Sequence, residues 1–293
     1  KQLKQQQEDT AKQQGSNSLI DRFIYQSTLK WNESDHHLSS SQQLFEVLYG
    51  DFEQQKHLLP DIVNAIEKMI EKAAKSESMT LYWFSAVLSL LDYFQQKSGK
   101  RTLVSFGLSN SDDHHIDSND NHHIASSSNN NITNLLSFQH SLFSLCLKCF
   151  SQYTHLLFHD LSSLVVPSIL QSDRGVFQDI TTGQMQPGEE LSSWLSAKVD
   201  SLQDHHLIAA EAFIVVIQQL FSSIFHHIDA LLINALVTSN AGKSSIVTPR
   251  NGFQAKIAVS HIENWMHEVE LVHILHAYRA TGLKYTKAAA TLL

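Results

Sequence analysis

Apolar residues recur every three or four positions along most of the chain, which is the period of an amphipathic α-helix. The clearest stripe follows Pro60, a residue that suits the first helical turn because its missing N–H would have no partner there. The stripe consists of Ile62, Ile66, Met69, Ile70 and Ala73, and charged residues occupy the opposite side. The pattern predicts a helix that packs one face on a core.

The same period predicts further helices along the chain. They are Leu19–Leu29, Ser41–Phe52, Thr80–Lys97, Leu135 to a break near Pro167, Glu189–Leu202, Leu207–Val237 and Ile262–Ala280. Residues 253–259 alternate briefly, and Ser260 with Glu263 has the spacing of a capping box that would start the last helix. The chain has only 4 Pro and 10 Gly, fewer than a many-turned β fold needs. We therefore predict an all-α, elongated bundle of about eight to ten helices.

Two polar segments interrupt this pattern. Residues 1–18 carry one leucine and predict a solvated polar tail, or alternatively the end of an upstream coiled coil. Residues 105–134 are mainly Ser, Asn, Asp and His, and predict a disordered or mobile low-complexity insertion. Residues 19–293 are otherwise predicted to form one helical domain. Because the chain begins with Lys1, we expect it to be a fragment of a longer protein.

Charge and composition exclude several classes of protein. The chain has 21 Lys and Arg against 29 Asp and Glu, a net charge of −8, so it lacks the basic footprint of a nucleic-acid binder. The apolar segment Leu207–Val237 contains Glu211 and Asp229, which favours a buried soluble helix over direct membrane insertion. Two cysteines and no apolar leader predict a reducing, cytoplasmic location.

The candidate reactive residues all favour a structural interpretation. Cys146 and Cys149 lie in the middle of a helical stripe, so we predict core cysteines rather than a redox or zinc pair. The 18 histidines occur largely as doublets, whose side chains diverge on a helix, and no HExxH spacing is present. Metal binding by the histidines of the 114–123 loop is an alternative. Gly242-Lys243-Ser244 lacks the earlier glycine of a phosphate-binding loop, because Val237 occupies that position. We predict no catalytic, cofactor-binding or metal-binding residue and no enzyme activity.

Two sequence blocks near the C-terminus carry a more specific signal than helical periodicity alone. The first, QQLFSSIFHHIDALLINALV, spans Gln218–Val237, and the second, GFQAKIAVSHIENWMHE, spans Gly252–Glu268. Together with LYWFSAVLSLLDYFQQKSG at Leu81–Gly99, these blocks resemble the DIL (dilute) domain of the globular tails of class V and class XI myosins. The matching positions are Gln219, Phe221, Leu231, Leu232, Asn234, Leu236, Gly252, Gln254, Lys256, Val259, Ser260, Ile262, Glu263 and Trp265. Lys256 and Ala258 depart from the family pattern, which has Arg and Asn there.

The resemblance covers Leu44–Ala280 and implies a helical fold of the myosin globular-tail type. It implies a non-catalytic tail module that binds cargo or adaptor proteins and links an actin motor to vesicles or organelles in the cytoplasm. The resemblance is also compatible with a parent protein that dimerises through a coiled coil. The first alternative function is that of a DIL module in an afadin-like junctional or Ras-pathway scaffold. The second alternative is a helical enzyme or metalloprotein that uses the histidines. The sequence assigns no partner-binding residue and no cofactor.

Overall fold

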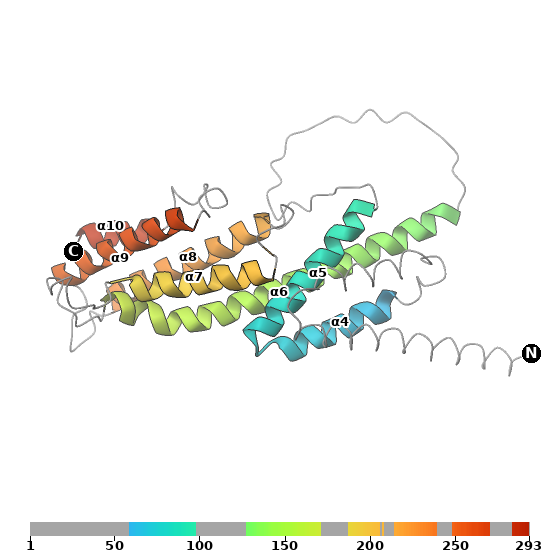
Figure 1. Cartoon of the computed structure of the whole chain (residues 1–293), viewed down its shortest axis with the longest axis horizontal. Coiled ribbons are helices and arrows are strands. Elements are labelled where there is room, and N and C mark those ends of the chain that lie inside the picture. Colours follow the sequence, from blue (N-terminus) through green and yellow to red (C-terminus); the bar gives the residue numbers. More distant parts are fainter. Residues whose placement is uncertain are drawn as a thin grey trace, which may run out of the picture. The chain divides into compact units, whose positions relative to one another are not determined.

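The computed structural model of the chain describes residues 59–97, 127–170, 187–205, 207, 214–238, 248–269 and 283–292 (Figure 1). Seven α-helices and no strand occur in these ranges, which confirms the predicted all-α class. They are α4 (Leu59–Ala73), α5 (Glu77–Lys97), α6 (Ser127–Leu170), α7 (Glu189–Asp204), α8 (Ile214–Thr238), α9 (Pro249–Glu268) and α10 (Lys284–Leu292). The predicted tail 1–18 and the predicted helices Leu19–Leu29 and Ser41–Phe52 lie outside the described residues.

The chain divides into two compact units, Lys1–Cys149 and Phe150–Leu293, with the division inside α6. Each unit has its own buried side chains and is described by itself. The predicted single domain over 19–293 and its boundaries remain predictions.

In the first unit, α4 and α5 form a helical hairpin. Four members of the predicted α4 stripe are buried, Ile62, Ile66, Ile70 and Ala73, whereas Met69 is only partly buried. Leu59, outside the predicted stripe, is also buried. The Thr80 hydroxyl donates to the Ala73 carbonyl at 2.9 Å and so ties α5 to the end of α4. The largest fully buried side chains of α5 are Trp83, Phe84 and Phe94, as expected for a helix that is apolar nearly all round.

Helix α6 begins earlier than the sequence predicts. Residues 127–134, the end of the predicted 105–134 insertion, are helical, and 105–126 lie outside the described residues. Extending an existing helix adds one hydrogen bond per residue, whereas starting one costs several ordered residues. Ser and Asn are also tolerated best near a helix start. The polar composition that predicted a mobile segment is therefore compatible with a first helical stretch.

The predicted break near Pro167 is wrong, because α6 continues through Pro167 to Leu170. Proline removes one backbone hydrogen bond, which usually ends or bends a helix. Here Val165 and Ile169 are both fully buried, one turn apart on either side of Pro167. Burial on both sides of the proline holds the last turn in place despite the lost hydrogen bond.

Helix α8 is the core helix of the second unit. Its buried residues include Ile217, Leu220, Phe221, Ile224, Ile228 and Leu232. By length and composition alone, its span Ile214–Leu236 could cross a membrane, the single such helix among the described residues. Its packing against α6, α9 and α10, described below, instead indicates a core helix. Leu207, predicted as the start of this helix, lies in the turn that follows α7, where its N–H donates to the Leu202 carbonyl.

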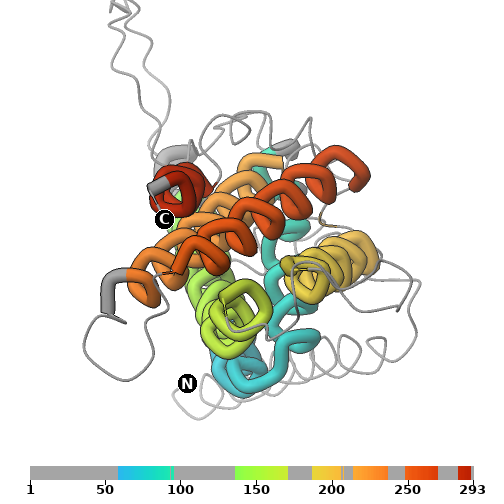
Figure 2. Tube along the Cα trace, turned by 90° about the vertical axis from the view of Figure 1, so that its left-hand side faces the viewer, coloured from blue at the N-terminus to red at the C-terminus, as the bar shows by residue number. Residues whose placement is uncertain are grey.

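The predicted capping box at Ser260 and Glu263 is wrong, because both residues lie inside a single helix, α9. That helix begins where Thr248 accepts a hydrogen bond from the Asn251 N–H at 3.2 Å, with Pro249 as its first residue. A threonine cap followed by proline is a strong helix start, and the caps decide where a helix begins. Helix α10 packs against both α9 and α8 (Figure 2).

Candidate docking site

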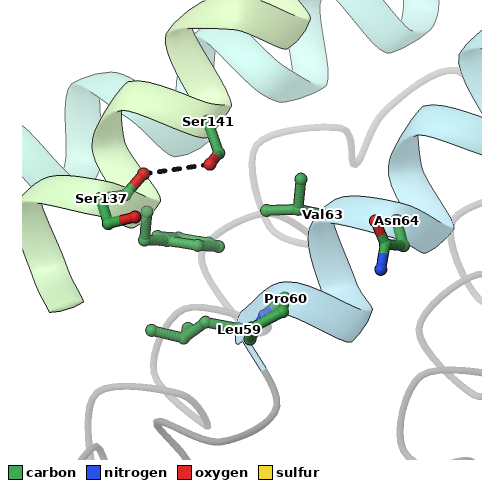
Figure 3. Close-up of a pocket in the computed structure, with 7 residues that line it drawn as sticks. Leu59, Pro60, Val63, Asn64, Ser137 and Ser141 are labelled. Atoms are coloured by element: carbon green, nitrogen blue, oxygen red, sulfur yellow. Dashed lines mark hydrogen bonds between the residues drawn. The ribbon is translucent and has the colours of Figure 1, made fainter.

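A groove of about 320 Å³ lies between α4 and α6 in the first unit (Figure 3). Its lining residues are Leu59, Pro60, Val63, Asn64, Ser137, Phe138 and Ser141. On each helix these positions are spaced by one, three or four residues, which places them on one face. Figure 3 shows Val63 of α4 on the side of the groove opposite Ser137 and Ser141 of α6. The groove therefore combines an apolar floor with a polar edge.

Packing in the first unit holds the two walls of the groove in position. The ring of Phe138 packs against that of Phe94 of α5, with centroids 4.9 Å apart. The Ser141 hydroxyl donates to the Ser137 carbonyl of its own helix at 3.0 Å, so it is not directed at a ligand. The apolar floor of the groove suits the side chain of a peptide, and the groove volume lies at the small end of the roughly 300–1,000 Å³ of ligand pockets.

An ion-pair cluster also joins α4 to α6. Lys148 Nζ lies 2.8 Å from a Glu71 carboxylate oxygen and 2.9 Å from one of Glu67. The hydrogen bonds that Lys148 donates to Glu71 and Glu67 raise the pKa of Lys148, and the same bond to Glu71 lowers the pKa of Glu71. All three side chains are partly exposed, so solvent screens these pairs and their contribution to stability is small.

In the second unit, the tryptophan of the Gly252–Glu268 block anchors α9 to α7. Trp265 is buried, and its Nε1 donates to the Ser196 hydroxyl at 2.7 Å. On its other side the ring lies 6.3 Å from that of Phe221 of α8, between centroids. Trp265 thus joins three helices, which is a structural role.

Gly188, which immediately precedes α7, lies in close contact with α9. Gly188 has a left-handed φ of 88°, and a Cβ added there would lie 2.8 Å from Ala258 Cα. A glycine is required for both reasons, and Ala258 is fully buried at the same contact. The contact also explains the departure from the family's Asn at this position, since a larger side chain at Ala258 would displace α7.

Helices α6 and α8 meet through stacked rings. Phe158 and His227 lie 4.0 Å apart between centroids, with planes inclined by 8°, and His227 Nε2 lies 3.4 Å from the Ser162 hydroxyl. Burial lowers the pKa of His227, because it disfavours the charged imidazolium, and a backbone hydrogen bond at Phe158 opposes this effect in part. His227 is therefore a neutral packing residue at pH 7. Nothing in the local sequence distinguishes His227 from the exposed His226.

Cys146 and Cys149 are both free and buried, as predicted. Burial raises the pKa of the Cys149 thiol to about 12 and that of Cys146 well above its ordinary value. Both thiols therefore stay protonated and unreactive at neutral pH. Within the described residues no group of three His, Cys, Asp or Glu side chains could hold a metal ion. The predicted histidine doublets at 36, 114 and 122, and Gly242-Lys243-Ser244, lie outside the described residues.

The quoted family positions lie mostly in the core of the second unit. Phe221, Leu232, Leu236, Gly252, Gln254, Val259, Ile262 and Trp265 are buried, whereas Gln219, Asn234, Lys256 and Ser260 are exposed. The pattern thus records how α8 and α9 pack, and it does not mark a binding surface. The sequence does not mark the groove residues, because apart from the buried Leu59 and Phe138 they are exposed or partly exposed positions outside the apolar stripes.

The comparison with known families agrees with this assignment. Residues 219–293 match the DIL domain. No curated protein matches the chain. The match includes all of α9 and α10 and most of α8, so the chain carries a DIL domain at residues 219–293.

Proposed function

We propose that this protein is a non-catalytic module that binds cargo or adaptor proteins, as part of the tail of a class V/XI-like myosin. In this role it links an actin motor to vesicles or organelles in the cytoplasm. The observation that carries the proposal is the DIL domain at residues 219–293, a domain that occurs in the globular tails of these myosins. The all-helical fold of the described residues supports it.

The groove between α4 and α6 is our proposed docking position for an adaptor peptide. An apolar side chain of the peptide would occupy the space above Val63 and Phe138, where it would be removed from water. The side chains of Asn64 and Ser137 at the polar edge would face the peptide backbone. A groove of this size holds one or two side chains, so affinity would depend on a few residues, as in other peptide-binding grooves.

The test is fluorescence anisotropy with labelled peptides from vesicle adaptors of actin motors. We expect saturable binding at about micromolar concentration for at least one adaptor. Val63→Glu, which places a charge in the groove, should weaken that binding at least about tenfold. The matched control is Val215→Glu, since Val215 is 40% exposed on α8 and does not line the groove.

The outcomes separate two parts of the proposal. Binding that survives both substitutions would refute the groove as the docking position. The absence of saturable binding across the adaptor panel would refute the cargo-binding function. A DIL module of an afadin-like scaffold remains the alternative, and the coding sequence around this chain distinguishes the two. A motor head and coiled coil support the myosin, whereas Ras-association and PDZ domains support the scaffold.

A further inference from the structure

A single buried carboxylate holds the amino-terminal end of α10. Asp229 of α8 is 5% exposed, and its two oxygens accept from the Tyr285 N–H at 3.1 Å and the Thr286 N–H at 2.6 Å. The Thr286 hydroxyl also donates to Asp229. The first N–H groups of a helix have no partner within it, and a carboxylate there also interacts favourably with the helix dipole. Asp229 therefore supplies, from another helix, the cap that α10 lacks in its own sequence.

The residue before α10 is strained. Leu283 has a φ of 50°, in the left-handed region that branched L residues rarely adopt. Its side chain is nonetheless buried, and the Lys287 N–H donates to its carbonyl at 3.0 Å. Such a conformation persists only when neighbouring contacts enforce it. Two contacts act on either side of this backbone: the Leu283 side chain is buried, and Asp229 accepts from the amides of Tyr285 and Thr286.

Apolar burial contributes little to the attachment of α10. Among its side chains whose placement the structure describes, Thr286 and Ala290 are buried and Lys284, Tyr285, Lys287, Ala288 and Thr291 are exposed. The amount of apolar surface removed from water sets the hydrophobic contribution, and an alanine supplies little of it. Lys287 pairs with Glu263 of α9, but both side chains are partly exposed, so the pair is weak. Among the side chains that the structure describes, Asp229 and the buried Leu283 are therefore the main contacts that attach α10.

We propose that α10 is a clasp, which detaches from α8 and α9 as a unit while the remainder of the second unit stays folded. Asp229 is the residue that keeps the clasp closed. Its detachment releases the strain at Leu283, exposes the buried Asp229 carboxylate and separates the partly exposed Glu263 from Lys287. A substitution at Asp229 should therefore shift the equilibrium between the attached and detached states of α10.

Hydrogen exchange of the full chain, followed by mass spectrometry, tests the clasp. In Asp229→Asn, which keeps the shape but weakens the acceptor, peptides covering 284–292 should exchange at least about tenfold faster. Peptides of α7 and α9 should change by less than about twofold. Asp200→Asn, an exposed aspartate on α7, is the matched control and should leave α10 unchanged.

Two results would overturn the proposal. One is an α10 exchange rate that does not respond to Asp229→Asn, and the other is a rise in exchange shared equally by α7, α9 and α10. Should Asp229→Asn fail to fold, the unmodified chain decides the question in low urea. The α10 amides should then exchange through an opening with a smaller urea dependence than that of the α8 amides. Equal urea dependence would show that the two helices open together and that no clasp exists.

Discussion

Trp265 and Ser196 lie 69 residues apart in the sequence, and the indole N–H of one donates to the hydroxyl of the other at 2.7 Å. The bond connects α9, inside the DIL match, to α7, outside it. A buried indole N–H that loses its partner costs free energy because water cannot replace the hydroxyl. The segment 219–293 therefore packs in part against a helix, α7, that lies outside the family match.

Removing this bond should destabilise the second unit measurably. Trp265→Phe keeps most of the apolar surface but removes the donor and leaves a small void, so we expect a loss of about 1–3 kcal/mol in unfolding free energy. Trp194→Phe is the control, because Trp194 is only half-buried on α7, and should cost less than about 1 kcal/mol. Urea unfolding followed by circular dichroism measures both. Equal losses for the two variants would contradict the anchoring role of Trp265.

The period of the apolar residues was sufficient to predict the helical class and the buried stripes of α4 and α5. It was insufficient for α9, whose buried face includes the small residues Gly252, Ala255 and Ala258. Small residues do not register as a hydrophobic stripe, so the segment resembled a short alternating run with a helix start at Ser260. The large Phe253, which the alternation counts as apolar, is 50% exposed. Close helix approach explains this choice of residues, and only the three-dimensional packing reveals it.

Contacts between distant parts of the chain likewise could not be predicted from the sequence. Asp229 looked like an isolated charge in an apolar helix, and its three donors lie more than fifty positions away. Pro167 carries a strong local signal for a helix end, which the burial of Val165 and Ile169 overrides. The groove residues give no local signal at all. Tertiary burial thus decided each of these points against the local pattern.

The contact between Gly188 and Ala258 predicts a strong limit on side-chain size. Ala258→Asn, which introduces the family residue, should destabilise the fold by about 1–3 kcal/mol because the added atoms have no space beside Gly188. Ala230→Asn on the exposed side of α8 is the control and should cost less than about 1 kcal/mol. Thermal or urea unfolding measures the difference. A tolerated asparagine at 258 would show that α7 can move away from α9 without loss.

The two cysteines should resist thiol reagents in the folded chain. Their burial keeps them protonated at neutral pH, and the pKa of Cys149 is raised to about 12. Labelling with a chromogenic disulfide at pH 7.5 should therefore proceed only as fast as the protein opens, and should become rapid in denaturing urea. Labelling of either cysteine in the native state, at the rate of a free thiol, would disprove the core assignment.

The stacked pair of Phe158 and His227 should make the second unit sensitive to mild acid. In the unfolded chain His227 has the ordinary histidine pKa of about 6.5, and burial lowers its pKa in the folded state. Well above that pH the imidazole is neutral in both states, and the shift in pKa has no effect on stability. As the pH falls below that value, the unfolded chain binds a proton that the folded chain does not, so stability decreases until the folded pKa is reached.

His227→Gln removes this titration, and His226→Gln is the matched control because His226 is the exposed neighbour on the same helix. Urea midpoints at about pH 7.5 and about pH 5.5 measure the effect. The unmodified chain and His226→Gln should lose stability on acidification, whereas His227→Gln should lose distinctly less. An identical loss in all three proteins would assign the acid sensitivity to other groups. Since the ring stacks on Phe158 and contacts Ser162, His227→Gln should itself be less stable at pH 7.5, and the comparison is therefore made between the two pH values within each protein.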